Sequence, residues 1–125
     1  DRILFMVEDL KNSPIGHMGF YHFDFTQKSV EIDNVVRGLP SMPGIMTCAL
    51  ESMCRWGYEY LKLRSYSLRV FSDNTSAIRL YKRCGFVPKK MIPLTKIKFK
   101  NTLLWKETSE KHKTSRYFLS MIKNN

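Results

Sequence analysis

Long hydrophobic runs are absent from this sequence of 125 residues. A helix that crosses a membrane needs about 20 consecutive apolar residues, and no run approaches that length. The first residues also lack the charged and apolar regions of a secretory signal. We therefore expect no membrane-spanning segment. Hydrophobic residues still make up 43% of the chain and aromatic residues 13%, which is typical of a globular domain rather than of a disordered segment.

Cysteine is also scarce. The sequence contains only Cys48, Cys54 and Cys84, and no two of them have the Cys-x-x-Cys spacing of many zinc sites. Cys48 and Cys54 are six residues apart in an expected helix, so they do not share one face. We therefore expect no metal site, and we expect reduced thiols in a cytoplasmic protein.

Acidic residues are nearly missing from the C-terminal part of the chain. The formal net charge is +10, and residues 79–125 carry 13 Lys or Arg against 2 Asp or Glu, whereas residues 1–78 carry 8 against 9. This asymmetry favours an anionic partner, such as nucleic acid, a diphosphate-bearing cofactor or a nucleotide-linked substrate. A solvated basic face is the alternative. Nucleic acid is not favoured, because no RRM, zinc-finger or similar signature is present.

The hydrophobic pattern predicts one α/β (α+β) domain with a mixed, mostly antiparallel sheet and the order β-β-β-α-β-α-β-β. A long helix is expected at Met42–Lys62 and a short one after residue 73. The first three strands should form an antiparallel meander, because their connections are short. The expected strands are Arg2–Glu8, Ile15–Phe25, Val30–Val36, Tyr66–Phe71, Phe86–Met91 and Ile97–Trp105.

Two features qualify the C-terminal part of this prediction. Pro88 and Pro93 should confine the fifth strand to an edge or a bend, because proline cannot donate a ladder hydrogen bond. The basic C-terminal tail, residues 106–125, should contain a helix. The apolar residues of that expected helix are Tyr117, Phe118, Met121 and Ile122.

The most informative stretch is residues 70–86, with the sequence VFSDNTSAIRLYKRCGF. Asn74 can cap a helix, because its side-chain oxygen can accept from an amide of the first turn. Ala77 and Tyr81 recur at helical spacing, and Gly85 can end the helix. The pattern predicts a short helix that holds one tyrosine on its inner face. Simple packing of that tyrosine in an ordinary α/β protein is the alternative.

This stretch resembles the V-x-x-x-N-x-x-A-x-x-x-Y-x-x-x-G-F segment of the GNAT superfamily of acyl-CoA-dependent N-acetyltransferases. The resemblance covers most of residues 15–87 and implies the GNAT fold, acetyl-CoA as cofactor and a small amine as acceptor. It implies that Tyr81 protonates the cofactor thiolate and that Asn74 and Ala77 lie near the cofactor. The family's usual N-terminal strand and two helices have no counterpart in residues 1–125, which we therefore expect to be one truncated GNAT domain.

A second stretch, residues 37–46 (RGLPSMPGIM), lies between the third strand and the long helix. Proline is tolerated in a first helical turn, and glycine lets a ligand approach the backbone. Free amides and the positive end of the helix dipole there form a natural diphosphate site. By resemblance, the loop corresponds to the family's Q/R-x-x-G-x-G/A motif, which binds the coenzyme A pyrophosphate. Gly44 matches the first glycine, while Ser41 and Met46 depart from the pattern. The expected cofactor-binding residues here are Arg37, Gly38, Pro43, Gly44, Ile45 and Met46.

Amide formation from a thioester needs a neutral amine and a protonated leaving thiolate. A tyrosine hydroxyl with a pKa of about 10 can donate to a thiolate whose own pKa is about 8.5, so Tyr81 is the predicted acid. Glu31 and Asp33 alternate along one face of the third strand, and either can be the base. Asp33 is nearer the expected reaction centre. Surface or acceptor-orienting roles for these acids are the alternative.

The resemblance also implies that the third strand diverges from the strand at Tyr66–Phe71. The pantetheine arm of the cofactor would insert between them. Backbone groups that would bind this arm and polarise the thioester carbonyl belong to Asn34, Val35 and Val36.

The acceptor is suggested by residues 31–38, EIDNVVRG, which look like acetyltransferases of surface-polysaccharide pathways. Those enzymes acylate the amino group of nucleotide-linked amino sugars, and a basic C-terminal half would suit a diphosphate on the substrate. A protein or peptide amine is the alternative acceptor. A basic nucleic-acid-binding module and an inactive fragment are the alternatives to an enzyme. The protein partner that we expect is a second copy of the chain, in a homodimer.

Overall fold

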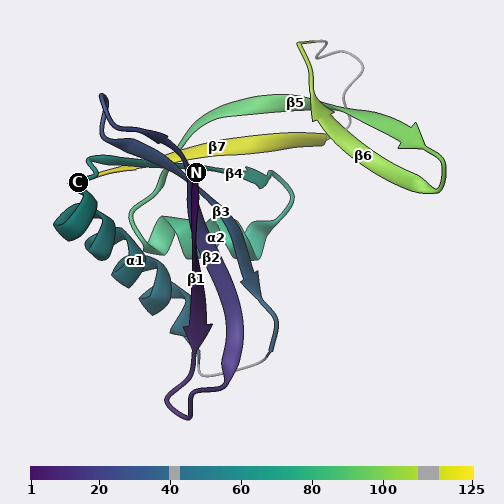
Figure 1. Cartoon of the computed structure of the whole chain (residues 1–125). Coiled ribbons are helices and arrows are strands. Elements are labelled where there is room, and N and C mark those ends of the chain that lie inside the picture. Colours follow the sequence, from purple (N-terminus) through teal and green to yellow (C-terminus); the bar gives the residue numbers. More distant parts are fainter. Residues whose placement is uncertain (40–42, 110–115) are drawn as a thin grey trace.

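The computed structural model describes residues 1–39, 43–109 and 116–125 (Figure 1). Its elements follow the predicted order through the sixth strand and then add a seventh, so the predicted fold class is confirmed. In chain order they are β1 (Arg2–Glu8), β2 (Pro14–Asp24), β3 (Ser29–Arg37), α1 (Ile45–Leu61), β4 (Ser65–Phe71), α2 (Thr75–Arg83), β5 (Val87–Phe99), β6 (Thr102–Glu107) and β7 (Arg116–Asn124).

The strands form one mixed sheet in the order β1-β2-β3-β4-β7-β5-β6. Neighbouring strands are antiparallel except β3 and β4, which are parallel. β1, β2 and β3 form the predicted meander. Both helices lie on the same side of the sheet, below β4 and β7 in Figure 1.

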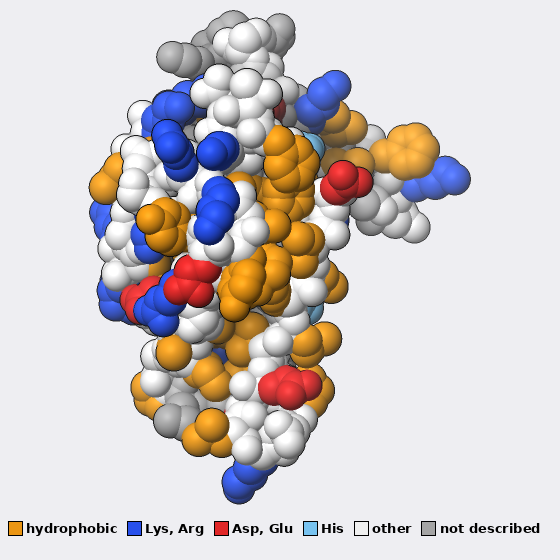
Figure 2. Space-filling view, turned by 60° about the vertical axis from the view of Figure 1, so that its left-hand side comes forward, with side chains coloured by type: hydrophobic (Ala, Val, Ile, Leu, Met, Phe, Trp, Pro, Cys, Tyr) orange, Lys and Arg blue, Asp and Glu red, His pale blue; other side chains and the backbone are white. Residues whose placement is uncertain are grey.

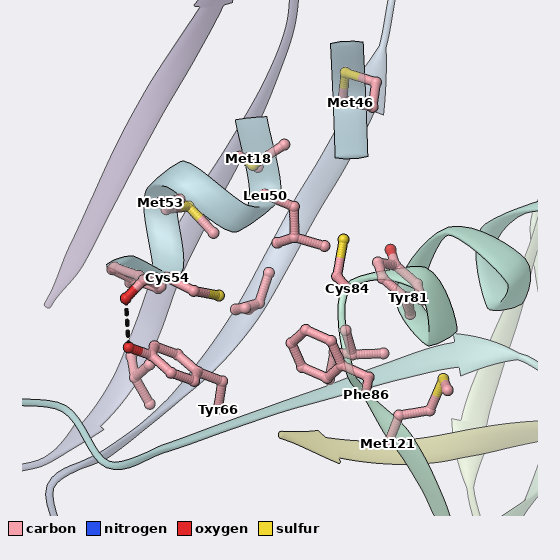
Figure 3. Packing of buried hydrophobic residues seen from close by; sticks show 14 of the residues in the cluster. Met18, Met46, Leu50, Met53, Cys54, Tyr66, Tyr81, Cys84, Phe86 and Met121 are labelled. Atoms are coloured by element: carbon pink, nitrogen blue, oxygen red, sulfur yellow. Dashed lines mark hydrogen bonds between the residues drawn. The ribbon is translucent and has the colours of Figure 1, made fainter. Parts of the chain in front are cut away.

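The hydrophobic core lies between the sheet and the two helices (Figure 3). β4 buries Tyr66 and Leu68 on alternate positions, as expected for a strand with one covered face. α1 buries Met46 and Leu50, one turn apart. The Tyr66 hydroxyl donates a hydrogen bond of 2.6 Å to the backbone carbonyl of Cys54, so a polar group from the sheet is satisfied by the helix.

β3 and β4 pair only where they begin. The parallel register joins Ser29–Glu31 to Ser65–Ser67, and their described residues show no pairing beyond it. On its other side, β4 pairs with β7 from Ser65 to Phe71. β3 and β4 therefore separate toward their C-terminal ends, and α2 follows directly at the end of β4.

β5 is longer than predicted. The sequence predicts an end at Met91, but the strand runs unbroken from Val87 to Phe99, so this boundary is wrong. Up to Leu94 it pairs only with β7, and from Leu94 onward it pairs with β6. Pro88 and Pro93 thus lie where one side of β5 has no neighbouring strand, which tolerates the missing N–H groups. The predicted edge character is confirmed for this half of the strand.

The C-terminal tail forms a strand, so the predicted helix is wrong. Tyr117, Phe118, Met121 and Ile122 have helical spacing, but β7 pairs with β4 on one side and β5 on the other. Met121 is fully buried in the core. The spacing of these apolar residues is compatible with a helix or a strand, and the backbone hydrogen bonds to two neighbouring strands decide for the strand. Residues 110–115, which precede β7, lie outside the described part of the chain.

β5 and β6 extend past the other strands as a hairpin arm (Figure 1). Its apolar side chains are largely exposed, from 38% for Ile97 to 62% for Phe99. A two-stranded hairpin alone is only marginally stable. The homodimer stays a prediction.

In the part of the chain that the structure describes, no helix is long and apolar enough to cross a membrane. The same residues include no group of three or more His, Cys, Asp or Glu side chains placed to hold a metal ion.

Candidate active site

α2 begins and ends where the sequence predicts. The Asn74 side-chain oxygen accepts hydrogen bonds of 3.3 Å from the backbone N–H of Ala77 and from the Ser76 hydroxyl. Asn74 is therefore the N-cap. Gly85 follows the last turn with a φ of +93°, a conformation that side chains rarely adopt. The cap and the glycine fix the position of Tyr81 on this short helix.

The N-terminus of α1 is open. The helix begins at Ile45 after Gly44, which has a φ of +81°, and this N-cap glycine has no side chain that could cap the first turn. That turn also contains no acidic residue. A Cβ at Gly44 would meet no heavy atom within 4 Å, so the positive φ rather than crowding favours glycine. The first-turn amides and the positive dipole end can therefore face an anion. The predicted helix start at Met42 lies outside the described residues.

The N-terminal turns of both helices line one cavity of about 350 Å³, the helix-end cavity. The charged residues of its described lining are Arg37 and Arg83, so the cavity is basic. The sequence predicts eight of its lining residues: Val35, Arg37, Gly44, Ile45, Met46, Asn74, Ala77 and Tyr81. It misses Thr47, Ser76, Leu80 and Arg83. Three of these four lie on α2 at the helical spacing that Ala77 and Tyr81 already show, which could have revealed them.

Some predicted cofactor residues lie elsewhere. Gly38 does not line the helix-end cavity, and its backbone N–H donates to the Ile15 carbonyl at 2.7 Å, which joins the loop to β2. Pro43 is exposed and does not line the cavity either. The backbone of Asn34 belongs to β3. The side chain of Asn34 and the whole of Ser41 lie outside the described part of the structure.

A second cavity, of about 390 Å³, lies where β3 and β4 separate, and we call it the strand-gap cavity. Glu31, Asp33 and Val36 line it from β3. Val35, Asn74 and Tyr81 line both cavities, so the two cavities meet beside Tyr81. All three predicted catalytic residues thus border one space. Lining residues that the sequence does not predict are Tyr21, Ile32, Arg69, Val70, Phe71 and Phe118.

Tyr81 is buried, with 7% of its surface exposed. It lies beside Cys84 and Phe86, and its hydroxyl is directed away from Phe86 (Figure 3). Burial, followed by the influence of the nearby Cys84 thiol, raises the pKa of Tyr81 to about 12. The hydroxyl therefore keeps its proton at neutral and mildly alkaline pH, as a proton donor must.

Glu31 belongs to a hydrogen-bonded network on the outer face of the sheet. It accepts from Arg69 Nε at 2.8 Å, and its other oxygen lies 3.1 Å from His22 Nδ1. Arg69 also donates to the Tyr21 hydroxyl at 2.9 Å and to Glu107 at 2.7 Å. Burial alone would raise the pKa of Glu31, but hydrogen bonds with Tyr21 and His22 and the charge of Arg69 lower it. A carboxylate stabilised in this way is a weak base.

Asp33 lines the same cavity two residues farther along β3. Its carboxylate forms an ion pair with Arg2 at 2.8 Å, and the side chains of Asp33 and Arg2 are 21% and 50% exposed. Asp33 and Glu31 are thus both ion-paired carboxylates in the wall of the strand-gap cavity.

Residues 1–87 match the model of a known protein family, the acetyltransferase (GNAT) domain. The chain belongs to the GNAT acetyltransferase family. The family that the 70–86 motif predicts is thereby confirmed. Acetyl-CoA as the cofactor and N-acetyl transfer as the reaction are what membership of this family implies, and for this chain they stay predictions.

Solved structures of spermidine N-acetyltransferase SpeG from Vibrio cholerae share the fold of this GNAT domain. A SpeG variant matches with a TM-score of 0.74 and 20% identity, and a complex with CoA and spermine matches with 0.75 and 18%. A dodecameric form matches with 0.73 and 20%. Each match covers 98% of this chain, but only 65%, 65% and 64% of those chains. No match was found among curated protein sequences.

At these identities the likeness shows the fold alone. The chain spans less than two thirds of the length of the SpeG chains named above. The SpeG structures are polyamine acetyltransferases, so the resemblance to enzymes that acetylate nucleotide-linked amino sugars gains no support from them. The truncation of the domain and the roles of the individual site residues stay predictions.

We predict that Glu31 makes the stability of this GNAT domain depend on pH. Its pKa is lowered in the folded chain, so its ionised form stabilises the fold fully above the ordinary pKa of a glutamate, about 4.3. This contribution is lost as the pH falls below that value and through the lowered pKa. Urea denaturation from pH 3 to pH 7 should therefore show a shallower acid loss for Glu31→Gln than for the unchanged chain. Glu59→Gln, at an exposed position of α1, is the control. Equal dependence of the unfolding free energy on pH in the two variants would contradict the prediction.

Proposed function

We propose that this GNAT domain transfers an acetyl group from acetyl-CoA directly to a primary amine. The observation that carries the proposal is the meeting of two cavities at Tyr81. One cavity is basic and includes an open helix N-terminus, and the other contains two carboxylates. A buried proton donor thus lies between a space suited to an anionic cofactor and a space suited to an amine.

We infer that the helix-end cavity would hold the diphosphate of acetyl-CoA. The uncapped first turn after Gly44 offers N–H groups and the positive dipole end. Arg37 and Arg83 add two positive charges, and a guanidinium can bind phosphate through two parallel hydrogen bonds. When bound, acetyl-CoA supplies an acetyl thioester with a thiol leaving group. The β3 backbone at residues 34–36 is not paired with β4 and can accept or donate hydrogen bonds along the cofactor.

Tyr81 is the proposed proton donor to the departing thiolate. Its hydroxyl has a pKa of about 12 and is therefore protonated when it is needed. A thiolate with a pKa of about 8.5 is a weaker base than a tyrosinate. Once Tyr81 has protonated the thiolate, however, the resulting thiol no longer attacks the acetyl group, so the reverse reaction is prevented. Solvent can then return the proton that Tyr81 has lost.

Asp33 is the proposed base, acting directly or through water. Both Glu31 and Asp33 border the strand-gap cavity, and both are ion-paired. Burial would raise the pKa of Glu31, but its hydrogen bonds and the charge of Arg69 outweigh burial and lower that pKa. A group whose charged form is stabilised takes up a proton less readily. Asp33 lies two residues farther along β3, nearer the expected reaction centre. Asp33 can accept the proton that the amine must lose, while Glu31 and Arg69 shape the cavity wall.

The acceptor that fits the strand-gap cavity best is a small cationic amine. Its described lining carries two carboxylates, Glu31 and Asp33, and one cation, Arg69, while Arg2, the ion-pair partner of Asp33, lies outside the lining. A nucleotide-linked amino sugar would bring a diphosphate toward these carboxylates, whereas a polyamine would bring further ammonium groups. The bound spermine of the SpeG complex supports a polyamine as the first acceptor to test. Amino sugars and protein amines are the second and third.

Gly44→Glu should abolish acetyl-CoA binding measured by isothermal titration. The new carboxylate would stand at the open N-terminus of α1 and repel the diphosphate. Gly44→Ala brings the strain of a positive φ without the charge, and Ser52→Glu brings the charge to an exposed site on α1. Both controls should keep binding. No binding by the unchanged chain, or equal binding by Gly44→Glu, would overturn the proposed cofactor site.

Tyr81→Phe should lower kcat by roughly 10²-fold or more, because a positioned general acid contributes 10²–10⁴-fold. The affinity for acetyl-CoA should be unchanged, since the ring and its packing remain. The readouts are steady-state rates with spermidine and titration with acetyl-CoA. Tyr60→Phe, at an exposed position of α1, is the matched control. Unchanged turnover in Tyr81→Phe would remove this hydroxyl from the mechanism.

Asp33→Asn should lower kcat/KM by roughly 10²-fold at pH 7. Activity should return toward pH 10, because an alkyl amine with a pKa of about 10.4 then loses its proton without a base. Arg2→Gln breaks the same ion pair but keeps the Asp33 carboxylate. It therefore distinguishes the loss of a base from the loss of the ion pair. Full activity of Asp33→Asn at neutral pH, or an equal loss in Arg2→Gln, would exclude Asp33 as the base.

A further inference from the structure

A third cavity, of about 720 Å³, lies between the second half of α1 and the end of β7, and we call it the α1–β7 cavity. It shares no lining residue with the helix-end or strand-gap cavities. Its volume is in the range of about 300–1,000 Å³ that small-molecule sites occupy. Its full lining is Glu51, Cys54, Arg55, Tyr58, Arg64, Cys84, Lys123 and Asn125.

The α1–β7 cavity has an excess of positive charge. Arg55, Arg64 and Lys123 face a single acidic lining residue, Glu51. Within the described residues, none of the three cations takes part in an ion pair. Figure 2, which brings the left-hand side of Figure 1 forward, shows several Lys and Arg side chains on that face of the molecule. The cavity therefore combines unpaired cationic donors with very few acceptors.

The two thiols of the α1–β7 cavity do not offset this charge. Cys54 and Cys84 are buried and free. Burial raises the pKa of Cys54 to about 12, and burial also raises the pKa of Cys84. Both side chains are therefore neutral at pH 7. They add neutral surface to the lining, and three cationic side chains against one anionic side chain leave an excess of positive side-chain charge for a ligand to neutralise.

The rest of the lining suits an organic group beside an anion. Tyr58 is 56% exposed and offers a flat ring at the cavity. Asn125 is fixed by hydrogen bonds of 2.8 Å to the Leu63 carbonyl and 3.0 Å to the Tyr66 hydroxyl. These contacts join the end of the chain to the core, so this wall of the cavity is held in place.

We propose that the α1–β7 cavity binds a small phosphate monoester. The dianionic phosphate would be held by the guanidinium groups of Arg55 and Arg64 and the ammonium group of Lys123, and the organic group would lie against Tyr58. Guanidinium donors match phosphate oxygens in pairs, and a dianion offsets the excess positive side-chain charge of the lining. The cavity is also much larger than a bare phosphate needs. This site is separate from the proposed acetyl-CoA site and does not depend on acetyl transfer.

The test is an NMR titration of the full chain with phenyl phosphate in 0.15 M KCl, where exposed charges are well screened. Saturable shifts are expected at the amides of Tyr58 and Arg64, with or without separate shifts at residues 44–47 of the helix-end cavity, which can also bind phosphate. Inorganic phosphate should bind more weakly than phenyl phosphate. Equal affinities would overturn the monoester assignment, and shifts confined to residues 44–47 would overturn the site.

Variants can distinguish binding in the α1–β7 cavity from nonspecific attraction of an anion to a basic protein. Arg55→Gln and Arg64→Gln should each weaken phenyl phosphate binding by about tenfold, the typical effect of losing a hydrogen bond to a charged group. Lys96→Gln and Lys98→Gln remove the same charge from the hairpin arm and should leave the affinity unchanged. Both arginines are exposed, so folding should persist, as circular dichroism can verify. Equal weakening in the arm variants, or none in the arginine variants, would overturn the proposal.

Discussion

The short parallel pairing of β3 with β4 is the constraint on which the candidate active site depends. β7 holds β4 along Ser65–Phe71 on one side, while β3 pairs with it only at Ser29–Glu31 on the other. The strand ends then carry backbone groups that no neighbouring strand satisfies, and such groups need water or a ligand. α2 closes the open end and brings Tyr81 to it. A continuous β3–β4 ladder would leave no strand-gap cavity.

The charges of the site are distributed over two cavities that meet beside Tyr81. Arg37 and Arg83 make the helix-end cavity basic, and Glu31 and Asp33 contribute two carboxylates to the lining of the strand-gap cavity. The buried, neutral Tyr81 borders both cavities, and ion pairs hold Glu31 to Arg69 and Asp33 to Arg2. The arrangement therefore offers an anionic and a cationic reactant neighbouring spaces.

The sequence predicts the features that depend on neighbouring residues and misses those that depend on distant strands. The Asn74 cap and the glycine that ends α2 lie close together in the chain, so the short helix could be read directly. The strand β7 could not, because the spacing of Tyr117 and Met121 also fits a helix and the decision rests with β4 and β5. Arg69 was missed for the same reason, since its partners come from β2, β3 and β6. The site could thus be predicted as a set of residues on two motifs, but not as two adjoining cavities, one basic and one lined by two carboxylates.

The start of α1 shows most clearly that local stability is not the only factor at this site. A Ser, Thr, Asp or Asn at the N-cap would stabilise the helix by about 1 kcal/mol, and acidic residues in the first turn would add to this. α1 has neither, and Gly44 instead turns the chain through a positive φ. α2, whose cap Asn74 also lines the cavity, follows the usual rule. Of the two helices, only α1 thus lacks the usual capping residues, and a bound anion could satisfy the amides at its N-terminus. Such exceptions to local stability rules are expected at functional sites. An anion there would supply the interactions that the missing cap does not provide.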